Sequence, residues 1–419
     1  MIISRDTYLN RLIAHRHNGL IKIITGIRRC GKSFLLFNLF KNFLLDDGIN
    51  PAHIIEIALD DRRNKALRDP DNCLKFVLDK VANSKEQFYL LIDEVQYMPE
   101  FEDVLNSFLH VANLDTYVTG SNSKFLSSDI ITEFRGRGDE LRVHPLTFKE
   151  FTKTVPDLRF DDAFNYYQTY GGLPYTALLS NEEEKGSYLK RLFDEVYLKD
   201  IIERNKIRNN LQVEILLNVI ASSIGSLTNP QRLENTFKSS GDKQISAVTI
   251  NQYLNYFIDA FLIEKAERFD VKGKKYISTP QKYYFSDIGL RNARLNFRQQ
   301  ETSHIMENII YNELRARNYS VDVGVVEINE RQESGHYVRK QTEIDFIAGK
   351  GSQKYYIQSA LSLDLETKFQ QEIRPLTNTG DSFKKIVVVK DNILPSRDEN
   401  GILTLGLKQF LTEPNCINL

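Results

Sequence analysis

The sequence predicts an α/β fold made of several domains. Up to Pro145, short apolar runs alternate with helix-like patterns, which is typical of layered α/β folds with right-handed crossovers. After Pro145 helical patterns dominate, and a second alternation of strands and helices follows near the C-terminus. The chain has 419 residues, enough for two or three domains of ordinary size.

The first strand is predicted at Gly19–Thr25, directly before a glycine loop, and a helix with apolar residues from Phe34 to Leu44 follows it. Further strands are predicted at His53–Leu59, Phe88–Asp93, Thr116–Thr119 and Leu141–His144, with helices at Asp71–Ala82 and Phe101–Ala112. Phe88–Asp93 is apolar until its last residue, as expected for a parallel strand covered on both faces.

Beyond Pro145, the segment Phe160–Asn205 has an almost continuous helical period, broken at Gly171–Pro174. Three helices and an alternating hairpin then resemble the outline of a winged helix, at Leu211–Gly225, Pro230–Ser239, Thr249–Ile263 and Asp270–Ser286. A second α/β unit is predicted from a helix at Glu307–Asn318, a helix near Lys368–Asn378 and a strand at Lys385–Val389.

Composition excludes several classes of protein. Lys plus Arg total 55 and Asp plus Glu total 56, so the net charge is −1. This charge neither favours nor excludes binding to nucleic acid. Three cysteines far apart give no zinc spacing and no disulfide framework, which fits the cytoplasm. No signal peptide and no apolar run of about 18 residues is visible, so we expect no membrane span.

The strongest motif is a phosphate loop of the pattern G-x-x-x-x-G-K-[ST], placed between a predicted strand and a predicted helix. Its residues are Gly26, Ile27, Arg28, Arg29, Cys30, Gly31, Lys32 and Ser33. The glycines allow main-chain N–H groups to turn toward phosphates, and the helix N-terminus favours an anion. Lys32 is expected to reach the β and γ phosphates and Ser33 to ligate Mg²⁺. ATP and Mg²⁺ are therefore the predicted cofactors.

Two adjacent carboxylates end the apolar strand at Asp93 and Glu94. Buried charge at that position is costly unless a cation compensates it. We expect Asp93 to bind the Mg²⁺ shell and Glu94 to activate water. The next strand ends in Thr119–Ser123, where Asn122 is our first choice and Ser121 our second for a group near the γ phosphate; a polar turn is the alternative.

Arg135 and Arg137 flank Gly136 shortly afterwards. An arginine here could contribute charge to the γ phosphate bound by a neighbouring subunit, in which case hydrolysis requires an oligomer. The alternative is a solvated basic turn.

A basic segment suggests a nucleic-acid contact. Between Glu264 and Gln300, nine Lys and Arg residues face four Asp and Glu. Lys272, Lys274 and Lys275 cluster on the proposed wing, with Tyr276, Tyr283 and Tyr284 interleaved. Such a patch suits phosphate contacts, whereas a solvated hairpin or a protein-binding wing are the alternatives.

The motifs GIRRCGKS, LLIDEVQ, TGSNS, RGR, PLTFKEF and YGGLP together resemble prokaryotic AAA+-type ATPases that carry a C-terminal domain related to restriction-endonuclease folds. The resemblance implies an ATPase core (1–155), a helical lid (156–208), a winged helix (209–298) and a nuclease-like domain (299–419). It also implies a homo-oligomer, of which a six-membered ring is one form, with Arg137 or Arg135 acting across the subunit interface.

A restriction-type nuclease needs an acid on a helix, an acid on a strand and a Glu/Gln-x-Lys on the next strand. Glu307, Asp345 and Gln358 match the first three positions, but Ala360 stands where the lysine belongs. Lys354 or Lys368 could substitute in space. We expect a fold without nuclease activity that serves nucleic-acid binding or structure.

These features predict an ATP-hydrolysing oligomeric motor that remodels DNA, with branched or junction DNA as one candidate substrate. A nucleotide-driven switch that binds a protein partner in signalling or defence is the first alternative, and an ATP-dependent nuclease is the second. DNA stimulation of ATP turnover distinguishes the motor from the switch.

Overall fold

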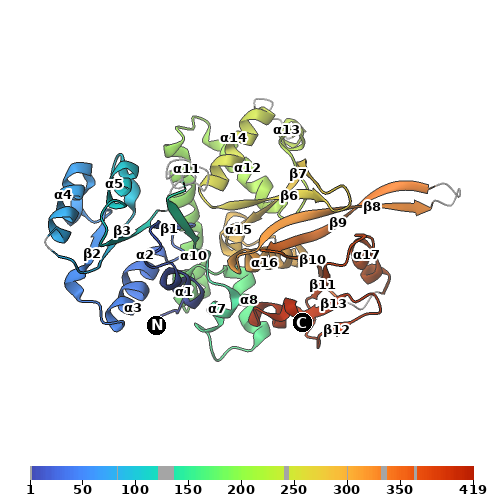
Figure 1. Cartoon of the computed structure of the whole chain (residues 1–419). Helices are drawn as coiled ribbons and strands as arrows, with labels where there is room; N and C mark the ends of the chain where they lie inside the picture. Colours follow the sequence, from blue (N-terminus) through green and yellow to red (C-terminus); the bar gives the residue numbers. More distant parts are fainter. Residues whose placement is uncertain are drawn as a thin grey trace. The chain divides into compact units, whose positions relative to one another are not determined.

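The computed structural model describes residues 2–82, 84–120, 136–239, 245–299, 301–331, 337–362 and 366–419. The described chain forms two compact units. Unit 1 comprises Met1–Pro145 with Asp259–Phe261, and unit 2 comprises Leu146–Ile258 with Leu262–Leu419. Figure 1 labels their helices and strands.

Unit 1 is built on a five-stranded sheet with the order β2-β3-β4-β1-β5. All its pairings are parallel, so the carboxyl ends of the strands share one edge. This confirms the predicted α/β class. The strands are β1 (Ile21–Thr25), β2 (Ile54–Ala58), β3 (Phe88–Asp93), β4 (Leu114–Thr119) and β5 (Gly138–Arg142).

The helices of unit 1 bury apolar residues against this sheet. For example, Val77 of α4 and Leu105 of α5 lie in one buried cluster with Ile92 of β3. The helical segments are α1 (Asp6–Ala14), α2 (Lys32–Phe34), η1 (Leu35–Phe40), α3 (Lys41–Asp46), η2 (Pro51–His53), η3 (Arg62–Arg68), α4 (Pro70–Val81), η4 (Val95–Tyr97) and α5 (Phe101–Phe108).

Strand β5 differs from the prediction of Leu141–His144. It begins at Gly138 and carries Asp139, Glu140 and Arg142, a polar pattern that hydrophobic periodicity does not detect. The sheet order places β5 at an edge beside β1, where charged side chains are tolerated because they reach water.

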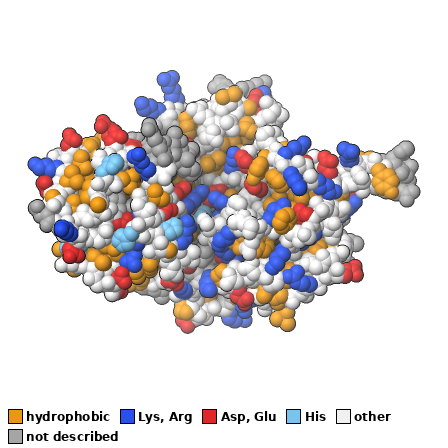
Figure 2. Space-filling model, in the orientation of Figure 1, with side chains coloured by type: hydrophobic (Ala, Val, Ile, Leu, Met, Phe, Trp, Pro, Cys, Tyr) orange, Lys and Arg blue, Asp and Glu red, His pale blue; other side chains and the backbone are white. Residues whose placement is uncertain are grey.

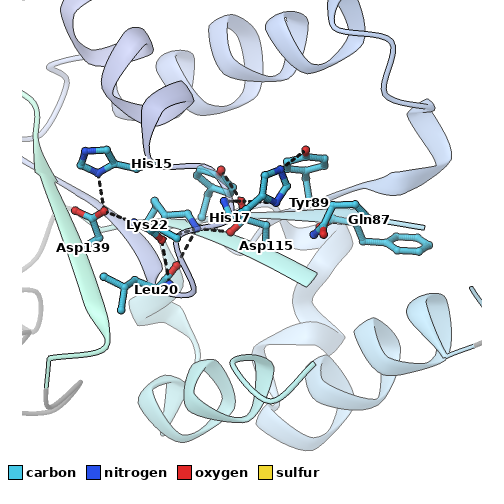
Figure 3. Close-up of polar contacts among 11 residues, drawn as sticks. His15, His17, Leu20, Lys22, Gln87, Tyr89, Asp115 and Asp139 are labelled. Atoms are coloured by element: carbon cyan, nitrogen blue, oxygen red, sulfur yellow. Dashed lines mark hydrogen bonds and ion pairs between the residues drawn. The ribbon is translucent and has the colours of Figure 1, made fainter. Parts of the chain in front are cut away.

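A buried ion pair ties β1 to β4. The Lys22 ammonium contacts the Asp115 carboxylate, and both side chains are almost fully buried. Lys22 Nζ also donates to Leu20 O at 2.8 Å, while Asp115 accepts from the Tyr117 hydroxyl at 2.8 Å and from the His17 N–H at 3.1 Å. Figure 3 shows these groups pointing toward one another between the strands. The network fixes the register that holds the carboxyl ends of β1 and β4 side by side.

Replacing Asp115 with alanine is expected to lower the free energy of unfolding of unit 1 by about 3–5 kcal/mol, because the Lys22 ammonium would stay buried without its counter-charge. Denaturant unfolding followed by circular dichroism measures the change. The matched control is Glu56→Ala, which breaks the 2.7 Å ion pair between Glu56 and Lys41 at the surface. The Glu56 side chain is 37% exposed and the Lys41 side chain 32%, so this variant should lose less than about 1 kcal/mol of unfolding free energy. Equal losses in the two variants would contradict a special role for the buried pair.

Unit 2 begins with a run of helices, as the sequence predicts for the region after Pro145. None of the helices in the described ranges is both long and apolar enough to cross a bilayer. The helices of unit 2 are α7 (Phe148–Thr152), α8 (Phe160–Tyr170), α9 (Pro174–Leu178), α10 (Glu182–Leu192), η6 (Phe193–Leu198), α11 (Lys199–Arg204), α12 (Asn210–Ser222), α13 (Pro230–Ser239), α14 (Ala247–Asp259), α15 (Ile288–Arg294), α16 (Thr302–Ala316), α17 (Glu366–Thr377), α18 (Leu407–Thr412) and η7 (Cys416–Asn418).

The sheet of unit 2 has eight strands in the order β12-β13-β11-β10-β9-β8-β6-β7. They are β6 (Ile263–Asp270), β7 (Lys275–Phe285), β8 (Ser320–Arg331), β9 (Tyr337–Lys350), β10 (Gln353–Ala360), β11 (Lys384–Val389), β12 (Ser396–Arg397) and β13 (Leu403–Gly406). The predicted basic hairpin is β6–β7, and β6 pairs in parallel with β8. One sheet therefore runs across the predicted domain boundary at 298/299, so the hairpin and the C-terminal strands are parts of one layer (Figure 1).

The break at Gly171–Pro174 is explained by a buried carboxylate. Asp287 Oδ2 accepts from the Gly172 N–H at 2.7 Å, and Oδ1 accepts from the Leu290 N–H at 3.0 Å, which caps α15. A Cβ on Gly171 would lie 2.3 Å from this carboxylate, and its φ of +73° also favours glycine. Burial raises the pKa of Asp287 to about 6, although main-chain N–H groups oppose the shift. The sequence did not predict α15.

Candidate functional site

The predicted phosphate loop connects β1 to α2 at the carboxyl edge of the unit 1 sheet. Gly26 and Gly31 have φ angles of +135° and +98°, which residues with a Cβ rarely adopt. A Cβ on Gly26 would lie 2.1 Å from Val143 O. Both glycines of the motif are thus required by the backbone path of the loop.

The far side of the loop is anchored within unit 1. Cys30 is fully buried and its Sγ lies 3.4 Å from Val143 O. Arg5 donates to Cys30 O at 3.0 Å and to His144 O at 2.6 Å. The Cys30 side chain therefore packs against the segment that follows β5 and stabilises the loop. Arg5 is a supporting residue that the sequence did not reveal, because it lies far from the motif along the chain.

Lys32 lies folded over the loop. Its side chain is buried, and its ammonium donates to Gly26 O at 2.9 Å and to Ile27 O at 3.1 Å. An ammonium group has three donors, and the loop carbonyls use two of them. Lys32 is thus in contact with the same loop whose N–H groups are predicted to bind phosphate.

Asp93 ends β3 and is buried. Its carboxylate accepts hydrogen bonds from the hydroxyls of Thr119, at the end of β4, and of Ser33, at the start of α2. Burial raises the pKa of Asp93; these hydrogen bonds oppose the shift, and the nearby Glu94 and Asp60 add to it. A divalent cation would remove this penalty. A hydroxyl beside a carboxylate is also a suitable oxygen donor pair for Mg²⁺, so Ser33 and Asp93 fit the predicted ion.

Glu94 follows in a left-handed conformation with φ +53°. Its N–H donates to Thr119 Oγ1 at 3.1 Å, and its carboxylate contacts the Gln96 amide. Thr119 therefore touches both acids and positions them at the sheet edge. Thr119 is a site residue that the sequence motifs do not predict. The available signal was a hydroxyl at the last position of a strand next to the one that ends in Asp93.

Four further predicted residues concern the γ phosphate. Asn122, Ser121 and Arg135 lie outside the described residues. Arg137 is exposed, and its carbonyl accepts from the Ile21 N–H at the start of β1. The phosphate loop follows the other end of this five-residue strand, roughly 16 Å away at about 3.3 Å per residue. Arg137 thus lies at the sheet edge opposite its own phosphate loop, and its role across a subunit interface stays a prediction.

Comparison with known proteins places this site in a family. The model of an AAA domain matches residues 18–152, which contain the loop, Asp93 and Thr119. A domain of unknown function, DUF8612, matches residues 161–301. An uncharacterized protein of Haemophilus influenzae is 32% identical over 391 residues, which cover 92% of this chain and 93% of that protein. This chain belongs to the same family. Its N-terminal part is an AAA domain.

A second relative and two solved structures complete the comparison. The uncharacterized protein MJ1544 of Methanocaldococcus jannaschii is 32% identical, covering 89% of this chain and 80% of its own length. The Aeropyrum pernix ORC1 protein in complex with DNA has a TM-score of 0.28 at 10% identity, covering 70% of this chain and 92% of that one. The Saccharomyces cerevisiae Hsp104–ADP complex has a TM-score of 0.33 at 13% identity, covering 76% and 43%. Because both TM-scores lie below 0.5, neither structure indicates what the AAA protein binds.

Beyond the AAA domain, two of the three nuclease-type residues, Glu307 and Asp345, come together in unit 2 around a lysine that was not predicted for this site. Lys282 Nζ, on β7, lies 2.8 Å from Glu307 Oε1, 2.6 Å from Glu343 Oε1 and 3.6 Å from Asp345 Oδ1. Gln358 Oε1 accepts from the Asp345 N–H at 3.2 Å. We call Lys282, Glu307, Glu343 and Asp345 the Lys282 centre.

Of the two predicted substitute lysines, Lys354 lies at another place in unit 2. Lys354 lies 3.9 Å from Asp381 and 4.1 Å from the ring centroid of Phe383. Lys368 lies outside the residues whose side chains the structure describes. Lys282 is one of the nine Lys and Arg residues of the basic segment, and the pairing of β7 with β6 places it in the buried interior.

Burial governs the charges of the Lys282 centre. It opposes the charged form of Lys282, but the three carboxylates outweigh it and raise the pKa of the lysine. Burial raises the pKa of Glu307 to about 7, against the effect of Lys282. The ammonium therefore stays charged at neutral pH, and the carboxylates share its single positive charge.

The predicted nucleic-acid residues Lys272, Lys274 and Lys275 are exposed at the turn of the β6–β7 hairpin. Tyr276 is 61% exposed beside them. Tyr283 and Tyr284 are buried, so the expectation that they interleave with the basic patch is wrong, because that end of β7 packs into unit 2. On the face shown in Figure 2, acidic and basic side chains of the described residues are interspersed, so a nucleic-acid contact on that face would be local.

Proposed function

We propose that this AAA protein is an ATP-hydrolysing motor that acts on DNA as a homo-oligomer. The observation that carries the ATPase step is the convergence of the phosphate loop with Asp93 and Glu94. Ser33 and Thr119 link the two segments through the Asp93 carboxylate. Parallel strands deliver all of these groups to one edge, where α/β proteins bind nucleotides.

In this proposal the loop N–H groups hold the phosphates of ATP, and Lys32 exchanges a loop carbonyl for phosphate oxygen. Ser33 and Asp93 would hold Mg²⁺, which when bound neutralises phosphate charge. Glu94 orients the attacking water and accepts its proton. Asn122 contacts the γ phosphate, and Arg137 or Arg135 is contributed by a neighbouring subunit.

The DNA step is supported by two exposed groups of residues in unit 2. Lys272, Lys274 and Lys275 can contact phosphates without reading sequence. Helix α14 exposes uncharged amide side chains, which are the groups that read adenine in a major groove; they are Asn251, Gln252 and Asn255. The polar helix is followed in the chain by the basic turn. A winged-helix domain that binds DNA needs both parts.

The test is ATP turnover with and without single-stranded, duplex and junction DNA. Turnover without DNA tests the ATPase, and stimulation by DNA tests the motor. Changing Lys272, Lys274 and Lys275 together to glutamine should abolish stimulation and weaken DNA binding at least about 10-fold. The slope of log K against log salt should also become shallower by about 0.9 for each phosphate that the variant no longer neutralises.

The matched control changes Lys75, Lys80 and Lys85, which are exposed lysines of unit 1, and should leave stimulation intact. Basal turnover that no DNA alters would refute the motor and favour a switch that binds a protein partner. Loss of stimulation in both triple variants would mean that general charge, and not the hairpin, attracts DNA.

A further inference from the structure

The Lys282 centre brings together side chains from three elements that are distant in the chain. Lys282 lies on β7, Glu307 on α16, and Glu343 and Asp345 on β9. Lys282 is only 3% exposed, and Glu307 and Asp345 are 9% and 8% exposed. Three acids surround one ammonium, but the Glu343 side chain is 31% exposed and Glu307, with a pKa of about 7, is partly protonated at neutral pH. The remaining buried negative charge needs hydrogen bonds.

Those hydrogen bonds are supplied by the protein itself. The Tyr284 hydroxyl donates to Glu307 Oε1 at 2.7 Å, the same oxygen that faces Lys282. The Ser359 N–H donates to Asp345 Oδ2 at 2.9 Å. Glu307 and Asp345 therefore each accept a hydrogen bond from another part of the protein, in addition to their contact with the Lys282 ammonium.

Gln358, the third residue of the nuclease pattern, is engaged at both ends of its amide. Its Oε1 accepts from the Asp345 N–H at 3.2 Å, and its Nε2 donates to Glu372 Oε2 at 2.7 Å. In a nuclease the Gln358 side chain would offer its oxygen to a metal ion. Here its two hydrogen bonds link β10 to β9 and to α17.

The restriction-endonuclease resemblance implies Mg²⁺ held by Glu307, Asp345 and Gln358. These residues do not fit that ion. Mg²⁺ requires near-octahedral oxygen ligands at about 2.1 Å, whereas the space between these carboxylates is taken by a positively charged nitrogen. In the described part of the chain, no three His, Cys, Asp or Glu side chains are placed to share a metal ion.

We propose that the Lys282 ammonium is the permanent cation of this centre in place of Mg²⁺, so that the centre fastens β7 to α16 and β9 and does not cleave phosphodiesters. The hairpin that carries Lys272, Lys274 and Lys275 is then held rigidly on the C-terminal sheet by an internal charge. Removal of the ammonium leaves these acids without their counter-charge, and we expect them to move together around a divalent cation.

The backbone at the end of α12 also packs closely against the Lys282 centre. Gly225, which follows α12, donates its N–H to Tyr283 O at 3.2 Å. A Cβ at Gly225 would lie 3.0 Å from Glu307 Oε1. The chain thus closes over Glu307 on that side, and the contact joins the end of α12 to the Lys282 centre.

The test is Mn²⁺ titration of the nucleotide-free protein, followed by electron paramagnetic resonance. The wild type and Asp345→Asn should bind the same number of Mn²⁺ ions. Lys282→Met should gain one ion, and the double variant Lys282→Met, Asp345→Asn should lose it again. Lys354→Met is the matched control, since Lys354 also lies near a carboxylate, Asp381, and it should gain none.

Two results would overturn the proposal. One is a wild-type Mn²⁺ site, or Mg²⁺-dependent DNA cleavage, that disappears in Asp345→Asn. The other is a folded Lys282→Met protein, by circular dichroism, that gains no ion. If Lys282→Met does not fold, the comparison of wild type with Asp345→Asn still decides, because a metal-dependent centre must differ between those two proteins.

Discussion

Replacing Lys32 with alanine is expected to weaken ATP binding by up to about 100-fold, because a buried ammonium that bonds to phosphate contributes up to about 3 kcal/mol. Turnover should also fall strongly, because Lys32 is expected to contact the β and γ phosphates. Fluorescent-nucleotide titration and phosphate release measure the two effects. The fold should survive, because among the described residues the Lys32 ammonium donates to carbonyls of its own loop and not to a buried carboxylate.

The control for this variant is Lys41→Ala, a lysine on the same helical stretch that pairs with Glu56 at the surface. It should bind ATP as the wild type does. ATP affinity that is unchanged in Lys32→Ala would remove the phosphate loop from the mechanism, and with it the proposed ATPase.

Changing Glu94 to glutamine is expected to keep ATP binding and slow hydrolysis by about 100-fold to 10,000-fold, the usual contribution of a general base. Glutamine has nearly the same shape but cannot accept the proton of the attacking water. The Glu94 N–H bond to Thr119 does not involve the side chain, so the strand ends should keep their positions. Single-turnover hydrolysis, measured beside equilibrium ATP binding, separates the two effects.

Glu100→Gln provides the comparison, because Glu100 is an exposed acid of the next turn with a similar left-handed backbone. It should hydrolyse ATP at the wild-type rate. Normal turnover in Glu94→Gln would assign the general base to another group. Equal slowing in both variants would point to the local charge and not to one carboxylate.

The parts of the site that depend on local sequence could be predicted. A phosphate loop needs glycines at fixed spacings because its φ angles are positive at Gly26 and Gly31. An apolar strand followed by acids marks the edge where Asp93 and Glu94 lie. Both signals are contained in a few consecutive residues, and the structure has the corresponding strands within a few residues of the predicted bounds.

Other contacts could not be predicted, because they join residues distant in the chain. Thr119 is an ordinary strand residue until β4 lies beside β3, and then it touches Asp93. Arg5 reaches the phosphate loop only after α1 packs in unit 1. The predicted start of β5, Leu141, lies beyond its observed start at Gly138, because an edge strand can be polar and apolar periodicity then gives no signal.

The sequence by itself determined the α/β class, the phosphate loop and the acids that follow β3, because glycine geometry and apolar periodicity act over short distances. Only the tertiary structure decided which lysine completes the C-terminal carboxylates and that the basic hairpin belongs to the same sheet as the last strands. The reason is physical: a buried charge is defined by the groups that surround it, and for Lys282 those groups come from α16 and β9, elements that the chain reaches only later.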